Sequence, residues 1–102
     1  MKKTIFVLLT LYCFQSLADI DTFKKGNTEY LNGNYTMAIS IYDSILTQGL
    51  ESSEIYYNLG NCYYKKSDWA NAIWHYEKSL QLERNEKTLQ NLELTKLKII
   101  DR

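Results

Sequence analysis

The 102-residue sequence contains no proline, one histidine, two cysteines and four glycines. A single histidine, His75, cannot form the histidine cluster that would hold a metal ion. Without a partner base it is also a poor catalytic residue, so we expect it to be structural. Neither a phosphate-binding glycine loop nor a G-x-S-x-G motif is present. These absences indicate a protein that is not an enzyme and that needs no metal or other cofactor.

An excess of charge of either sign is also absent, because twelve lysines and arginines balance twelve aspartates and glutamates. A neutral chain has no strong field to attract nucleic acid or an anionic lipid surface. We therefore expect no nucleic-acid partner. The length, with 45% apolar and 24% charged residues, is that of one small globular domain.

Residues 1–18 have the features of a secretory signal peptide. Lys2 and Lys3 precede an apolar run over residues 5–14, and small residues lie before a cleavage point after Ala18. The apolar run is too short to span a bilayer by itself. The sequence therefore predicts export to the periplasm or the cell envelope. The alternative is that the segment stays uncut as an N-terminal membrane anchor.

Removal of this segment would leave Cys62 as the single cysteine of the chain. A lone thiol cannot form an internal disulfide, so the stability of the exported chain must come from packing. Cys62 lies within a predicted helix, and we expect it to be a buried, unreactive thiol.

Residues 54–82 have the pattern of two helices joined by a tight turn. The first helix carries apolar or small residues at i, i+3, i+4 and i+7, which is one helix face: Tyr56, Leu59, Gly60 and Tyr63. Asp68 is the expected N-cap of a second helix that begins at Trp69. Glycine within a helix costs about 1 kcal/mol relative to alanine. Gly60 therefore predicts a close approach of the partner helix.

The same pattern occurs once more, earlier in the chain and at one constant spacing. The matching pairs are Gly26 and Gly60, Asn27 and Asn61, Tyr30 and Tyr64, Ala38 and Ala72, Ile39 and Ile73, Tyr42 and Tyr76, and Leu46 and Leu80. In this alignment Asn34 is the expected N-cap of the earlier unit's second helix. The spacing of these pairs, about 34 residues for one helix-turn-helix unit, is the period of the tetratricopeptide repeat.

The chain resembles that family most clearly in the run YYNLGNCYYKKSDWANAIWHYEKSLQL. The resemblance implies an all-α, tetratricopeptide-like α-solenoid with two repeats, residues 19–52 and 53–86, and a C-terminal capping helix, residues 87–102. Arg84 departs from the family pattern, which usually has proline there. Lys25 and Glu29 also replace the apolar residues of the second unit, which fits a first helix whose outer side faces water.

In this family the first helices of successive repeats line a concave groove, so the resemblance implies a partner-binding surface. The positions that match it in the two repeats are Phe23, Asn27, Tyr30, Tyr57, Asn58, Asn61, Tyr64 and Lys65, and in the last helix they would be Asn91, Thr95 and Lys98. Asparagine amides both donate and accept hydrogen bonds, and tyrosines supply contact area at low entropy cost. The alternative is that the asparagines only match the family consensus.

Some family members bind a C-terminal carboxylate with lysine and asparagine side chains in this groove. Asn27 and Asn58 match that pattern. Phe23 stands where the first lysine belongs, however, and Thr88 and Leu92 stand where the last cations belong. We therefore do not expect a carboxylate clamp.

The predicted last helix, about residues 86–100, has an apolar arc wider than one neighbouring helix can cover. Leu94, Leu97 and Ile100 are candidates for self-association as a homodimer. Two repeats and one helix are also fewer than the roughly three repeats that a solenoid needs, so we expect a marginal domain or a dimer. The alternatives are a few harmlessly exposed aliphatic residues, or a chain shortened from a longer relative.

The sequence thus predicts an exported adaptor that binds a segment of another protein. The signal segment, the repeat and the following NLELTKLK also resemble the N-terminal part of the tetratricopeptide proteins of the Bacteroides aerotolerance operon. That resemblance implies an envelope scaffold that contacts the membrane only through partners or through an uncleaved signal segment. An oligomerising structural module is the competing interpretation.

Overall fold

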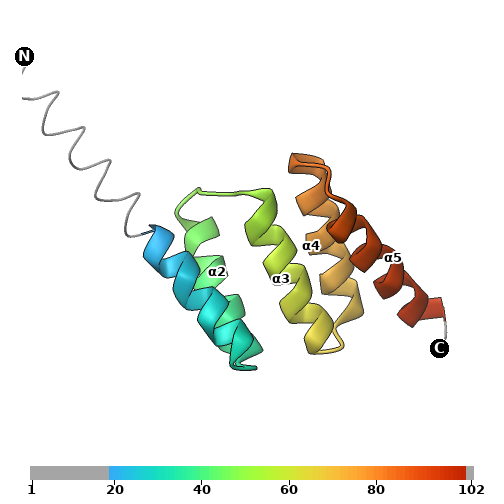
Figure 1. The fold of residues 1–102 in the computed structure, drawn as a ribbon, viewed down its shortest axis with the longest axis horizontal. Coiled ribbons are helices and arrows are strands. Elements are labelled where there is room, and N and C mark those ends of the chain that lie inside the picture. Colours follow the sequence, from blue (N-terminus) through green and yellow to red (C-terminus); the bar gives the residue numbers. More distant parts are fainter. Residues whose placement is uncertain (1–18, 101–102) are drawn as a thin grey trace, which may run out of the picture.

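The computed structural model describes residues 19–100, so the predicted signal peptide lies outside the described part of the chain. A first helix, described over residues 19–31, is followed by α2 (Tyr35–Thr47), α3 (Ser53–Lys65), α4 (Trp69–Leu82) and α5 (Glu86–Ile100). No strand occurs among these residues. The first helix, α3 and α5 run in one direction and α2 and α4 in the other (Figure 1). The predicted all-α, tetratricopeptide-like solenoid is confirmed.

The helix ends follow local capping chemistry. The Asp68 side chain accepts from the backbone N–H of Asn71 at 3.3 Å, which confirms the predicted cap of α4. Ser52 accepts from the backbone N–H of Ile55 at 3.1 Å and caps α3. Asn34 is the N-cap residue of α2, as predicted, but its side chain makes no cap bond. Its amide nitrogen instead donates to a carboxylate oxygen of Glu29 at 2.7 Å.

The helix pairs pack closely at the two predicted glycines. A Cβ atom on Gly60 would lie 2.5 Å from ring carbons of Tyr76, and one on Gly26 would lie 2.6 Å from the ring of Tyr42. No real Cβ atom fits at such distances, so each glycine makes room for one tyrosine. The close approach predicted from Gly60 is confirmed, and it recurs in the first repeat.

Two apolar clusters form the core. The first joins the two repeats and contains Ala38, Tyr42, Ile45, Ile55, Leu59 and Cys62, and the second joins α4 to α5 through Ala72, Tyr76 and Leu92. Cys62 is fully buried, as predicted, and burial raises the pKa of its thiol to about 12. The thiol therefore stays protonated and acts as a small apolar side chain.

Helix α5 is set one residue earlier than a strict continuation of the repeat would place it. The α2–α3 link is residues 48–52, whereas the α4–α5 link is residues 83–85 and α4 is one residue longer than α2. The buried residues of α5 are Thr88, Leu92 and Thr95, and they occupy the places that Ile55, Leu59 and Cys62 have in α3. Along the chain, each of these pairs is separated by one residue fewer than equivalent residues of the two repeats. The expectation that Thr95 faces the groove is therefore wrong.

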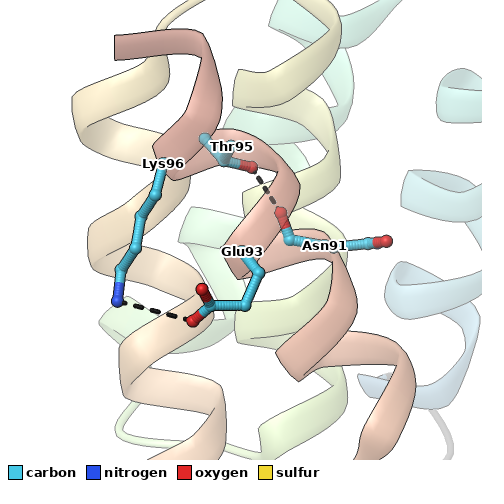
Figure 2. Close-up of polar contacts among 4 residues, drawn as sticks. All are labelled: Asn91, Glu93, Thr95 and Lys96. Atoms are coloured by element: carbon cyan, nitrogen blue, oxygen red, sulfur yellow. Dashed lines mark hydrogen bonds and ion pairs between the residues drawn. The ribbon is translucent and has the colours of Figure 1, made fainter. Parts of the chain in front are cut away.

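The side of α5 that corresponds to the α4-facing side of α3 is polar. In the same register, Glu93 takes the place of Gly60 and Lys96 that of Tyr63. Their side chains are 64% and 45% exposed and form an ion pair at 3.7 Å. Figure 2 shows this pair on one side of α5, with Asn91 pointing to the other. This side of α5 is therefore unsuited to accept a tyrosine ring as Gly60 does.

Candidate functional site

Seven of the eight predicted groove residues line two adjoining hollows on the face formed by the first helix, α3 and α5. The C-terminal hollow, about 260 Å³, is lined by Tyr30, Tyr57, Asn61, Tyr64, Lys65, Tyr76, Asn91 and Leu94. The N-terminal hollow, also about 260 Å³, is lined by Asn27, Tyr30, Leu31, Tyr42, Glu54, Asn58 and Asn61. Because both hollows share Tyr30 and Asn61, we treat them as one surface and call it the groove.

Phe23 is the eighth predicted residue, and it lies beyond the N-terminal end of the groove. Its ring packs against that of Tyr42, with centroids 5.9 Å apart. It also lines a third hollow, about 450 Å³, which shares Asn27 and Glu54 with the N-terminal hollow. Phe23 therefore belongs partly to the core and partly to an extension of the groove.

Each repeat builds the floor of the groove with one tyrosine and one asparagine. The Tyr42 hydroxyl donates to Oδ1 of Asn27 at 2.5 Å, and the Tyr76 hydroxyl donates to Oδ1 of Asn61 at 2.6 Å. Burial raises the pKa of both tyrosines far above its ordinary value. Both hydroxyls therefore remain neutral donors at any physiological pH.

An asparagine on the next helix donates a second hydrogen bond to each of these oxygens. Nδ2 of Asn58 donates to the same oxygen of Asn27 at 3.1 Å, and Nδ2 of Asn91 donates to that of Asn61 at 3.2 Å. The amide nitrogens of Asn27 and Asn61 have no partner within residues 19–100. The asparagines thus join successive repeats, and two of them still have donors available to a ligand.

The groove tyrosines are held by aromatic neighbours. Tyr64 meets Trp69 edge to face with ring centroids 5.2 Å apart, and Tyr30 meets Tyr35 in the same way at 5.5 Å. Tyr57 packs against Tyr76 with centroids 6.1 Å apart. Side chains fixed in this way lose little further freedom when a ligand binds.

The position of α5 changes which of its residues belong to the groove. Asn91 lines it as predicted, and Lys98 lies nearby with its Nζ 5.8 Å from the Trp69 ring centroid. Leu94, a predicted self-association residue, also lines the C-terminal hollow. Leu97 and Ile100 are 53% and 74% exposed.

Sequence reasoning treated Tyr42 and Tyr76 only as core residues and missed their hydroxyls at the groove floor. A signal was present, because each tyrosine follows its asparagine by 15 residues in both repeats. Thr88 and Leu92, named for the carboxylate clamp, are 2% and 4% exposed. They face α4 and cannot offer a side chain to the groove, which removes the positions assigned to the last cations.

The one histidine has a packing role. His75 is buried and its ring stacks on Tyr63 at a centroid distance of 4.9 Å. Its Nδ1 lies 2.7 Å from the backbone oxygen of Asn71. Burial lowers the pKa of this imidazole, so it is neutral at pH 7.

No group of three or more histidine, cysteine, aspartate or glutamate side chains within residues 19–100 is placed to hold a metal ion. In the same part of the chain, no helix is both long and apolar enough to cross a membrane.

Comparison with known proteins finds a family match for the second hairpin. Residues 53–86 match the family model described as the tetratricopeptide repeat. The second hairpin is therefore similar in sequence to a tetratricopeptide repeat. No curated protein matches the chain.

A tetratricopeptide structure also matches most of the described fold. A solved structure of the TPR2AB-domain:pHSP90 complex of yeast Sti1 superposes with a TM-score of 0.75 at 26% identity. The match covers 81% of this chain and 35% of the other, so this chain spans about a third of that protein chain. Tetratricopeptide repeats are interaction modules whose concave surfaces bind other polypeptides.

Proposed function

We propose that this chain is a non-catalytic adaptor that binds an extended segment of another protein in the groove. The observation that carries the proposal is the pair of adjoining hollows that share Tyr30 and Asn61. Together they give a continuous surface of aromatic faces and amide groups. The structure of a tetratricopeptide domain of yeast Sti1 in a complex with pHSP90 supports a polypeptide partner.

The chemistry of the groove suits a peptide backbone. The amide nitrogens of Asn27 and Asn61 are donors that meet backbone carbonyl oxygens, which every extended segment presents. The half-buried rings of Tyr30, Tyr57 and Tyr64 offer apolar area with a polar edge. An extended peptide satisfies both kinds of surface at once.

The setting that we propose is the cell envelope. The signal pattern of residues 1–18 supports export, and the resemblance to the aerotolerance tetratricopeptide proteins supports partners that are themselves bound to a membrane. The chain would then meet the membrane through those partners, or through residues 1–18 if they are not removed.

A peptide selection with a structural readout tests the binding proposal. Random twelve-residue peptides displayed on phage are selected on the immobilised chain, and the best peptides are titrated into ¹⁵N-labelled chain. We expect the side-chain amide signals of Asn27 and Asn61 to shift. As a control, the same peptides are titrated into the Tyr64→Arg variant, which fills the C-terminal hollow, and we expect weaker binding. Shifts confined to exposed residues of α2 and α4 would contradict the proposal.

Self-association through α5 is a second candidate function. Leu97 and Ile100 are well exposed and apolar on α5, which within residues 19–100 packs on α4. A homodimer that buries both side chains would remove this apolar surface from water. Sedimentation equilibrium of the wild type and of Leu97→Glu/Ile100→Glu tests it, and we expect a dimer only for the wild type. A monomeric wild type at high concentration excludes this candidate and leaves the groove proposal unaffected.

A further inference from the structure

We infer that the groove selects one class of segment: an extended peptide with an apolar side chain next to an acidic one at the α5 end, and a basic residue at the other end. This inference rests on the proposed function and adds the chemistry of the partner. It follows from the distribution of charge along the groove and from one apolar residue on α5.

Lys65 gives the C-terminal hollow a positive charge. It is the one charged side chain among the residues that line this hollow, and it is exposed. It forms no ion pair within residues 19–100. Lys98 adds a second positive charge nearby, because it lies over Trp69, which packs on Tyr64 of the hollow. An acidic residue of a bound peptide would meet two cations here.

The opposite end of the groove is negative. Glu54 is the one charged side chain that lines the N-terminal hollow. The extension beyond it adds Asp19 and Glu51 against a single cation, Lys24. Negative charge therefore predominates around Phe23, where a basic residue of a peptide fits.

The two charged ends act separately on a ligand. Glu54 and Lys65 stand at opposite ends of α3, which runs the height of the molecule (Figure 1). Eleven residues of helix separate them, which at 1.5 Å per residue is roughly 16 Å. This exceeds the Debye length of about 8 Å at physiological salt, so each charge acts on a ligand nearly independently of the other.

Leu94 adds an aliphatic side chain to the C-terminal hollow, as Leu31 does to the N-terminal hollow. When the helices are aligned by their buried residues, Leu94 on α5 takes the position that Asn61 has on α3 and Asn27 on the first helix. Its side chain is 53% exposed and lines the hollow together with Tyr30 and Tyr64. An apolar side chain of the peptide can bury this area, next to the acidic residue that faces Lys65.

Defined peptides test the inference. The probes are fluorescein-labelled ten-residue peptides with blocked ends, carrying a central leucine, two aspartates beside it and two lysines at the far end, made in both chain directions. One control peptide has asparagines in place of the aspartates, and the other has serine in place of the leucine. Binding to the full chain is measured by fluorescence anisotropy at low and high salt.

We expect the better of the two directions to bind most tightly. Loss of the leucine should weaken binding by about tenfold, the effect of leaving one aliphatic side chain unburied. Loss of the aspartates should weaken it by about fivefold at low salt and less at high salt, because exposed ion pairs are modest and screened. Equal binding of all three peptides would overturn the inference.

Matched variants assign these effects to residues. Lys65→Glu should abolish the preference for aspartate, whereas Lys66→Glu should keep it, because the Lys66 Nζ bonds the Thr36 hydroxyl at 2.7 Å outside the groove. Leu94→Asn restores the residue type of the other repeats and should abolish only the preference for leucine. Lys65 and Leu94 are exposed, and circular dichroism checks that both variants stay folded.

The outcomes separate this inference from the proposed function. If peptides selected from the random library bind the groove while the designed set shows no preference, the inference is wrong and the adaptor proposal stands. If neither set shifts the amides of Asn27 and Asn61, both are wrong. If Lys66→Glu lowers the aspartate preference as much as Lys65→Glu does, the effect is one of net charge and the assignment to the hollow fails.

Discussion

Helices α3 and α5 occupy equivalent places in the solenoid but differ on the sides that do not face the core. Both bury three residues against the preceding helix pair, and both donate an asparagine amide to the preceding unit. Helix α3 then presents Gly60 to a following tyrosine, whereas α5 presents the charged Glu93 to water. The core positions of a repeat thus fix its docking, while a few outer residues decide whether another helix packs on it.

Exchanging these outer residues between α3 and α5 should have the largest effect on the free energy of unfolding. In Gly60→Glu the new side chain collides with the Tyr76 ring and places a charge in the core, so we expect a loss of more than about 3 kcal/mol. The reciprocal change Glu93→Gly should cost only about 1 kcal/mol, through helix propensity. Urea unfolding followed by circular dichroism measures both. A loss below about 1 kcal/mol for Gly60→Glu would mean that the Gly60–Tyr76 contact is not needed.

Removing the buried hydroxyls should have an intermediate effect. Tyr76→Phe leaves the Asn61 oxygen with one donor of its two, and we expect a loss of about 1 kcal/mol in the free energy of unfolding. Tyr42→Phe should behave alike, because Asn58 remains as the second donor to Asn27. Tyr64→Phe, at a half-buried position in the groove, should change stability by less than about 0.5 kcal/mol. Clearly unequal effects of the two buried changes would show that the repeats are not equivalent.

The contact between α3 and α4 at His75 should make stability depend on pH, whereas α5 has no such contact. Burial lowers the His75 pKa below its unfolded value of about 6.5. As pH falls through that value the unfolded chain takes up the proton first, so stability is complete above it and declines below it. Urea unfolding from pH 8 to 5.5 should show this decline, and His75→Phe should remove it. Burial raises the pKa of Asp43, and a raised carboxyl pKa acts in the opposite sense, adding stability as pH falls.

The smallest expected effect is in the turns of the two repeats. Gly33 in the first repeat has φ +80°, and Ser67 has φ 59° at the equivalent place in the second. Ser67→Gly should relieve the left-handed conformation and raise stability by about 0.5–1 kcal/mol, with Gly33→Ser giving the opposite change. Thermal unfolding of both variants measures it. A lower melting temperature for Ser67→Gly would contradict the comparison.

The sequence was sufficient to predict much of the repeat. The period of the repeat placed the helices and paired Gly26 with Gly60, because identical residues recur where identical contacts are made. It also placed Asn27, Asn58 and Asn61 on one face. The bond of Asn34 to Glu29 was not foreseen, since capping propensity does not include competition from a carboxylate one turn away.

The register of α5 could not be predicted from residue identity. Thr88 and Thr95 fill places that Ile55 and Cys62 fill in α3, so the match is one of size and burial. The one-residue offset arises from a short link, residues 83–85, in which the Asn85 side chain accepts from the first backbone N–H groups of α5. For this reason the place of Leu94 in the C-terminal hollow was not predicted.

The side-chain oxygens of Asn27 and Asn61 each accept two hydrogen bonds, and this limits what the groove can offer a partner. A side-chain amide in water exchanges its oxygen and nitrogen by a half-turn rotation, and so presents either one. Here a tyrosine hydroxyl and a second amide both hold the oxygen, so that rotation would break two bonds. The two nitrogens therefore keep one fixed orientation, and a bound chain must bring acceptors to them in every complex.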